Sequence, residues 1–168
     1  MEETLFKPES GPLSNQGREK RMTESKLDAD KEQLKNWYKP LLDNVVQEML
    51  KRKAVAATAV EANPVWVFPF KILIAKVWGM GEKTRFIWTI SGEDVITDHI
   101  PGKLAATPKD AARHFALKWQ MDADRLLALG KNKKPGGGSQ ESMGNYANKL
   151  IQNAESLYDL AERDDIWA

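Results

Sequence analysis

The sequence predicts an α+β fold, in which a small antiparallel sheet packs against helices. Apolar residues recur with helical spacing near the beginning and the end of the chain, while runs of β-branched and aromatic residues occupy its middle. Helices do not alternate with the strands, so the chain lacks the crossover connections that a parallel sheet requires. The expected order of elements is α-β-β-β-α-α, within a single globular domain that covers residues 30–168.

The composition limits the functions that the chain can perform. Its 168 residues suit one domain with a genuine core, and its formal net charge of +1 gives no strong field toward phosphate backbones or anionic lipids. Cysteine is absent, which excludes disulfides and cysteine-ligated metals. The longest apolar run, residues 65–80, contains two lysines and a proline and is too short to cross a bilayer. We therefore expect a soluble, cytoplasmic protein without membrane contacts.

The N-terminal part of the chain divides into a polar tail and a first helix. Residues 1–29 contain scarcely an apolar side chain, so we expect a disordered polar tail. From Lys31 an apolar stripe with three- and four-residue spacing predicts an amphipathic helix, and residues 51–64 then lead into a loop. Pro40 lies within the stripe and predicts either a kink or a new helix start. The stripe comprises Leu34, Trp37, Tyr38, Leu41, Leu42, Val45, Val46, Met49 and Leu50.

Two strands joined by a tight turn form the centre of the predicted sheet. Residues 70–78 and 84–91 are rich in β-branched and aromatic side chains, and the glycine-bearing segment between them is typical of a hairpin turn. A third, shorter strand is expected at residues 94–100, where Pro101 and Gly102 end it.

Two helices complete the predicted domain. Thr107 is a suitable N-cap, followed by a proline and by an acidic residue in the first turn, so a helix is expected from there to Leu129. A last helix is expected from about Ser142, after a flexible linker rich in lysine and glycine that begins at Lys131. The core face of the first of these helices comprises Ala112, Phe115, Ala116, Trp119, Ala123, Leu126 and Leu127.

Both histidines of the chain are candidates for acid–base chemistry. Asp110 and His114 are four residues apart on the predicted helix, so the carboxylate can orient or charge the imidazole. Asp98 and His99 end the third strand. A short connection can bring them close to Arg113 and His114, and this assembly is the sharpest enzymatic hypothesis. Two simpler interpretations stay open: a structural pair on the helix, and a strand whose adjacent residues point to opposite faces.

Other polar and aromatic residues carry weaker signals. No cluster of His, Asp or Glu has the spacing of a metal site, and no nucleotide-binding fingerprint is present, so we expect neither a metal nor a cofactor. Lys118, Asp122 and Arg125 have the spacing of a solvated charge ladder. Trp66 and Trp167 lie at element edges, where an exposed ring can anchor a partner; the alternative is that both rings pack and hold the chain ends.

Three segments carry a family resemblance. They are a W-x-I-S-G strand end at residues 88–92, an A-R-H-F-x-L-x-W-Q helix at 112–120, and an A-E-x-L-Y helix at 154–158 that closes on Trp167. With them, the chain resembles a family of short, uncharacterised bacterial proteins, mainly from gammaproteobacteria, over about residues 31–168. That family is a domain of unknown function, so the resemblance implies no activity, cofactor or catalytic residue.

Two classes of function stay open. The first is a non-enzymatic protein-interaction module, adaptor or inhibitor-like, because catalytic motifs are missing and aromatic residues are abundant; it predicts an exposed apolar patch. The second is a small enzyme or ligand-binding domain that uses His114 with Asp110, Asp98, His99 or Arg113. It predicts a concave pocket lined by at least three of these side chains. Nucleic-acid binding through the lysine-rich linker ranks last, and the sequence leaves the oligomeric state open.

Overall fold

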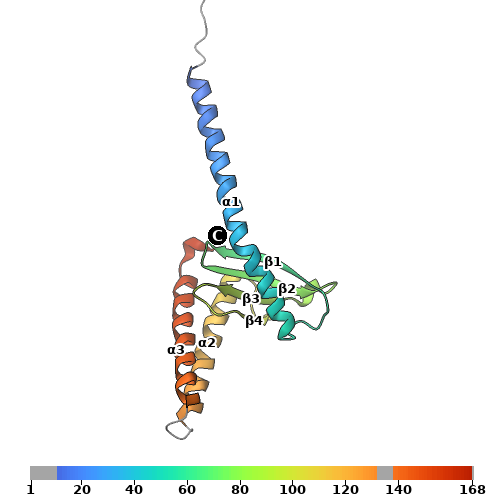
Figure 1. Cartoon of the computed structure of the whole chain (residues 1–168), viewed down its shortest axis with the longest axis vertical. Helices are drawn as coiled ribbons and strands as arrows, with labels where there is room; N and C mark the ends of the chain where they lie inside the picture. The colour runs from blue at the N-terminus through green and yellow to red at the C-terminus, as the bar shows by residue number, and fades with distance from the viewer. Residues whose placement is uncertain (1–10, 132–137, 168) are drawn as a thin grey trace, which may run out of the picture. The chain divides into compact units, whose positions relative to one another are not determined.

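A computed structural model describes residues 11–131 and 138–167, with side chains at positions 23, 25–131 and 141–167. The helices and strands follow one another as α1, β1, β2, β3, β4, α2 and α3, and short 3-10 turns separate some of them (Figure 1). The chain is an α+β protein whose antiparallel sheet packs with helices, which confirms the predicted fold class. The first ten residues of the predicted tail and residues 132–137 of the predicted linker lie outside the described residues.

Helix α1 (Gly11–Lys51) begins earlier than the sequence analysis expects. The chain divides after Trp37 into two units, and the helix contributes to both. In the first unit residues 25–33 are all exposed, so no core surrounds this stretch. Its backbone is nevertheless helical, because residues 18–37 contain neither glycine nor proline and are rich in strong helix formers. In the second unit the helix continues through Pro40 as one element, and this proline is exposed.

Four strands form one antiparallel sheet in the order β1-β2-β3-β4. β2 (Ile72–Gly79), β3 (Ile87–Gly92) and β4 (Asp98–Pro101) correspond to the three predicted strands. β1 (Val60–Phe68) is an additional edge strand that begins inside the segment expected to be a loop. The register shifts next to Pro64, and an edge strand tolerates proline because one of its sides needs no partner.

The alternation of side chains gives the sheet two apolar faces. On one face Ile74, Trp88 and Ile90 belong to the main core, which α2 and α3 complete. On the other face Val77 packs with Val45 and Met49 of α1. Because both faces are covered, β2 is buried almost throughout, which explains why its sequence has no clean polar face.

Helices α2 (Pro108–Lys131) and α3 (Gly138–Ala161) lie side by side against the main core (Figure 1). The N-cap of α2 is the predicted one: the amide of Asp110 donates a hydrogen bond to the Thr107 hydroxyl at 3.1 Å. Helix α2 also contacts β4, at the edge of the sheet. This contact determines which side chains of α2 face the strand. The candidate site lies between α2 and β4.

Candidate functional site

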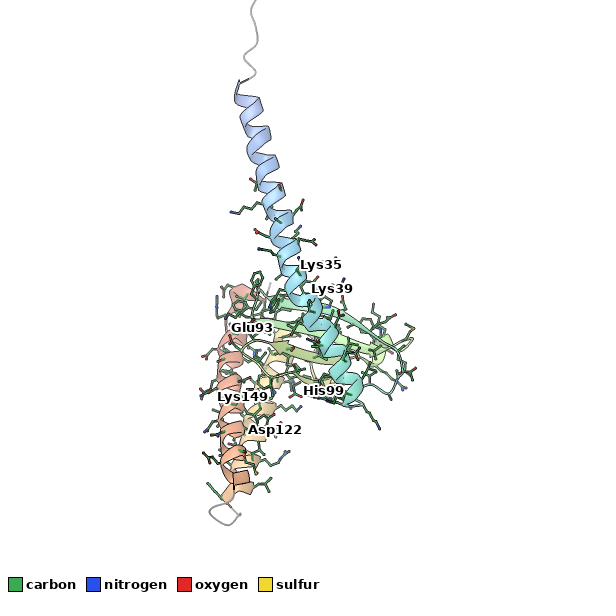
Figure 2. All side chains as sticks on the ribbon, viewed as in Figure 1. Lys35, Lys39, Glu93, His99, Asp122 and Lys149 are labelled. Carbon is green, nitrogen blue, oxygen red and sulfur yellow. The ribbon has the colours of Figure 1, made fainter. Side chains whose placement is uncertain are left out.

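A cleft with a volume of about 890 Å³ lies between α2 and the β4 edge of the sheet. Its walls come from α2, from β4, and from the turns η1 (Lys83–Arg85) and η2 (Gly102–Leu104) with the residues next to them. Both histidines of the chain, His99 and His114, line this cleft. Figure 2 labels His99 on β4 and Asp122 on α2, which come from the two opposite walls.

One wall of the cleft is a single stripe of α2. Its residues are three and four positions apart and therefore share one side of the helix. Leu117 and Met121, in the middle of the stripe, are 54% and 53% exposed. The stripe thus gives the cleft an apolar centre with polar groups on either side. It comprises His114, Leu117, Lys118, Met121, Asp122 and Arg125.

The opposite wall of the cleft contains two basic residues, Arg85 and Lys103, and the apolar Leu104. The amide of Gly102 donates to the carbonyl of Phe86 at 3.1 Å, so η2 packs on the residue that follows η1. A side chain at this glycine would put its Cβ 2.4 Å from that carbonyl oxygen, so only glycine permits the approach. The contact puts Arg85, the last residue of η1, and Lys103 of η2 on the same wall of the cleft. Leu104 lies beside them and also lines the cleft.

Asp98 is a buried carboxylate behind the cleft. It accepts hydrogen bonds from the ammonium group of Lys118 at 2.8 and 2.9 Å and from the indole N–H of Trp119 at 2.8 Å. The amide of His99 donates to the same carboxylate at 2.8 Å, and the guanidinium of Arg52 lies 3.8 Å away. These donors occupy both oxygens, so the carboxylate holds α2 against β4 and is not free to act as a base.

The pair of Asp98 and Lys118 also closes the outer edge of β4. The amide of His99 donates to the carboxylate, and the carbonyl of His99 accepts a hydrogen bond from the lysine at 3.3 Å. Two residues further along the strand, Pro101 has no amide hydrogen. At the other edge of the sheet, the register shift next to Pro64 interrupts β1. The sheet is therefore a poor template for the addition of another strand.

The imidazole of His99 is half-buried in the wall of the cleft. Its Nδ1 atom is buried and has no hydrogen-bond partner within the part of the chain that the structure describes. Burial lowers the pKa of His99 below its ordinary value; the carboxylate of Asp98 opposes this shift, and the charges of Lys118 and Arg52 add to it. At pH 7 the ring is therefore neutral, and because Nδ1 is buried, Nε2 is the atom left to hydrogen-bond a group in the cleft.

The other predicted site residues lie apart from this wall. The carboxylate of Asp110 lies 3.8 Å from the guanidinium of Arg113, which also lies 3.4 Å from the carboxylate of Glu162, just after α3. Among the described residues, Asp110 forms no ion pair with His114. Asp98 lines a neighbouring cavity of about 300 Å³ and His99 lines the main cleft, as expected for adjacent residues of a strand. The main cleft thus contains two of the five predicted side chains, fewer than the three that the enzymatic hypothesis requires.

The two candidate partner anchors, Trp66 and Trp167, stack on each other. Their ring centroids are 4.0 Å apart and the planes meet at 15°. The indole N–H of Trp66 donates to the carbonyl of Ile166 at 2.8 Å, and that of Trp167 donates to the carbonyl of Leu160 at 2.9 Å. Both rings pack against the main core. They hold β1 to the C-terminal segment, which corresponds to the alternative interpretation of these residues.

Sequence reasoning missed the role of Lys118. Its spacing indicates a solvated ladder with Asp122 and Arg125, and the structure does place the last two 3.8 Å apart. Lys118 instead bonds to Asp98, twenty residues earlier in the chain. No local pattern reveals this pair, because it depends on the position of α2 along β4.

The described residues contain no group of three or more His, Asp or Glu side chains arranged to hold a metal ion. Within residues 11–131 and 138–167, no helix is both long enough and apolar enough to span a bilayer.

The fold and the cleft define a small α+β domain with a concave site at the edge of its sheet. Residues 31–167 match the family model described as a domain of unknown function (DUF4826), and the chain belongs to this family. This match confirms the resemblance seen in the sequence to a family of unknown function. No curated protein and no solved structure gave a significant match to the chain.

Proposed function

We propose that this domain binds a small organic ligand in the cleft between α2 and β4. The observation that carries the proposal is the cleft itself: its volume of about 890 Å³ lies within the range of about 300–1,000 Å³ that is typical of ligand pockets. Its lining combines apolar side chains with a few polar groups, including both histidines of the chain. Such a combination provides affinity through the apolar surface and orientation through the polar groups.

The apolar centre of the cleft supports a bound ligand. Leu104, Leu117 and Met121 are each more than two fifths exposed, although they face a concave surface. Complete burial of one such side chain contributes about 1.5–3 kcal/mol of favourable free energy. A ligand that covers the exposed half of each side chain therefore gains about 1 kcal/mol of binding free energy per side chain. Together they would supply about 3 kcal/mol of binding free energy, and hydrogen bonds or charge would supply the rest.

Binding has stronger support than catalysis. The carboxylate of Asp98 is occupied by donors, and Asp110 lies outside the cleft lining and pairs with Arg113. Neither of these acids is therefore available to His99 or His114 as the third member of a catalytic set. The imidazoles are instead suited to hydrogen-bond a ligand.

The test uses the histidines as reporters. Because the chain contains two histidines and both line the cleft, every imidazole signal in an NMR spectrum reports on this site. We expect that members of a small-molecule fragment library shift both imidazole signals, and that Leu117→Lys abolishes these shifts. Leu27→Lys is the matched control, because Leu27 on α1 is exposed to the same degree, 53% against 54%. A library that leaves both imidazoles unperturbed would falsify the proposal.

A second candidate function is a protein-interaction module, adaptor or inhibitor-like. It is favoured by the apolar residues of α2 beyond the cleft: Leu127, which the sequence wrongly assigns to the core face, is 38% exposed, and Leu129 is 51% exposed. A partner would bind along α2 and not by strand addition, because both edges of the sheet are interrupted or occupied. We expect a partner recovered with the parent chain to be lost with Leu127→Lys and retained with Leu27→Lys. Equal recovery with both variants excludes this surface.

A further inference from the structure

We infer that the ligand of this cleft is a single-chain anionic amphiphile. Its anionic head would lie between Arg85 and Lys103, and its aliphatic chain would lie on Leu104, Leu117 and Met121. The inference rests on the proposed binding function and adds the chemical class and the orientation of the ligand.

The charge of the cleft lining supports an anionic ligand. Its basic residues are Arg85, Lys103, Lys118 and Arg125, whereas Asp122 is its acidic residue. The cavity therefore has an excess of positive charge within a protein whose formal net charge is only +1. A concave surface lined by one sign of charge concentrates ligands of the opposite sign.

This positive charge is unevenly distributed over the lining of the cleft. Lys118 is neutralised by two hydrogen bonds to Asp98, and Arg125 lies 3.8 Å from Asp122. Arg85 and Lys103, on the wall opposite α2, take part in none of the ion pairs among the described residues. The cations of the cleft without an ion-pair partner therefore belong to η1 and η2, opposite α2.

A backbone hydrogen bond joins the two segments that carry these cations. Arg85 precedes Phe86 and Lys103 follows Gly102, and the backbones of Phe86 and Gly102 are joined by a hydrogen bond of 3.1 Å. Glycine at 102 allows this approach, because a Cβ there would overlap the carbonyl oxygen of Phe86. This contact puts both residues on one wall of the cleft, where one anionic head can contact the guanidinium and the ammonium group.

A second cavity, of about 760 Å³, lies between the sheet and α3 and differs from the cleft in its charge. That cavity also combines polar and apolar side chains, but its charges are balanced. Its lining includes basic Lys71, Lys149 and Arg163 and acidic Glu93, Asp94 and Asp159. An excess of one sign is thus a feature of the α2–β4 cleft and not of every hollow on this domain.

The experiment compares four ten-carbon probes with the full chain: decanoate, decyl phosphate, decanol and decyltrimethylammonium. Each is titrated while the imidazole signals of His99 and His114 are followed by NMR. We expect the two anions to shift both signals and to bind at least about ten-fold more tightly than decanol, with the cation weakest. The comparison of decanoate with decyl phosphate then identifies the preferred anionic head.

Two variants test the position of the head. Arg85→Ala combined with Lys103→Ala should weaken decanoate binding by about two- to thirty-fold, as expected for the loss of two exposed charge pairs, and should leave decanol binding unchanged. Lys39→Ala is the matched control, since Lys39 is an exposed lysine of α1 outside the cleft, labelled in Figure 2. Circular dichroism confirms that each variant is folded. A change of less than two-fold in the double variant overturns the assigned position.

The remaining outcomes separate this inference from the proposed function. If decanol binds as tightly as decanoate, or the cation binds more tightly, the anionic class is wrong while binding in the cleft stands. If no probe and no library fragment perturbs the histidines, the binding function itself fails. Co-sedimentation of the chain with phosphatidylglycerol vesicles, without any shift from free decanoate, overturns the free amphiphile in favour of a membrane surface.

Discussion

Replacement of Asp98 by alanine tests whether the contact of α2 with the sheet edge depends on one buried carboxylate. Asp98→Ala removes the acceptor for the indole N–H of Trp119 and for the amide of His99, each at 2.8 Å. The Trp119 side chain is fully buried, so its indole N–H can regain a partner only from water that enters through the neighbouring cavity. The ammonium group of Lys118 also loses its partner, but that side chain is 37% exposed and can be hydrated.

The expected loss of stability follows from the donors that remain unsatisfied. A buried donor without an acceptor costs about 1–3 kcal/mol, so the indole N–H gives a loss of about 1–3 kcal/mol, and the amide of His99 adds less because it is only partly buried. Asp98→Asn retains one carboxamide oxygen and should cost about half as much. Asp94→Ala is the control: its side chain is 65% exposed and lies 3.5 Å from Lys71, so it should change the free energy of unfolding by less than about 0.5 kcal/mol.

The assay is equilibrium unfolding in urea at pH 7, followed by circular dichroism at 222 nm. The free energy of unfolding and the slope against urea are compared for the parent chain and the three variants. A loss of less than about 1 kcal/mol in Asp98→Ala would show that the carboxylate does not hold α2 in place. If the alanine variant does not fold, the free energies of unfolding of Asp98→Asn and Asp94→Ala still show whether the carboxylate holds α2 in place.

Three further predictions concern other parts of the domain. Gly102→Ala places a Cβ 2.4 Å from the carbonyl oxygen of Phe86 and should destabilise by about 1–3 kcal/mol in urea unfolding; a loss below about 0.5 kcal/mol contradicts the close approach. Trp167→Ala removes the ring stacked on Trp66 and should cost about 1–3 kcal/mol with a red-shifted tryptophan emission, whereas unchanged emission argues against the stack. Burial lowers the pKa of His99 in the folded state, so on acidification the imidazole is protonated more readily in the unfolded chain than in the folded one. The free energy of unfolding therefore falls as the pH drops below 6.5. His99→Gln should lessen this fall between pH 7.5 and 5, and an unchanged slope excludes His99 as its source.

The sequence reveals those parts of the fold that depend on local patterns. The hairpin of β2 and β3 combines β-branched and aromatic runs with a glycine turn, and Thr107 provides a complete start signal for α2. The same patterns do not predict β1, because Asn63 and Pro64 interrupt its apolar pattern. Its alternate residues are only partly buried, as is typical of an edge strand.

The candidate site is less visible in the sequence because it depends on contacts between distant segments. Local spacing singles out His114 but pairs it with Asp110, whereas the structure pairs Asp110 with Arg113. The side chains of His99 and His114 line one cleft because α2 packs along β4, and that packing is held by a lysine of α2 and a carboxylate of the strand. Periodicity identifies the apolar face of a helix, but it does not determine where along a strand that helix is held.

Lys118 donates hydrogen bonds to the carboxylate of Asp98 and to the carbonyl of His99. These bonds link the separation of α2 from β4 to the exposure of the outer edge of the strand. Any fluctuation that lifts the helix from the strand also uncovers backbone groups that other chains can pair with. The aggregation rate of this protein should therefore follow the free energy of that local opening more closely than the free energy of complete unfolding. Native-state hydrogen exchange at the amides of β4 would report this opening directly, in advance of any loss of secondary structure.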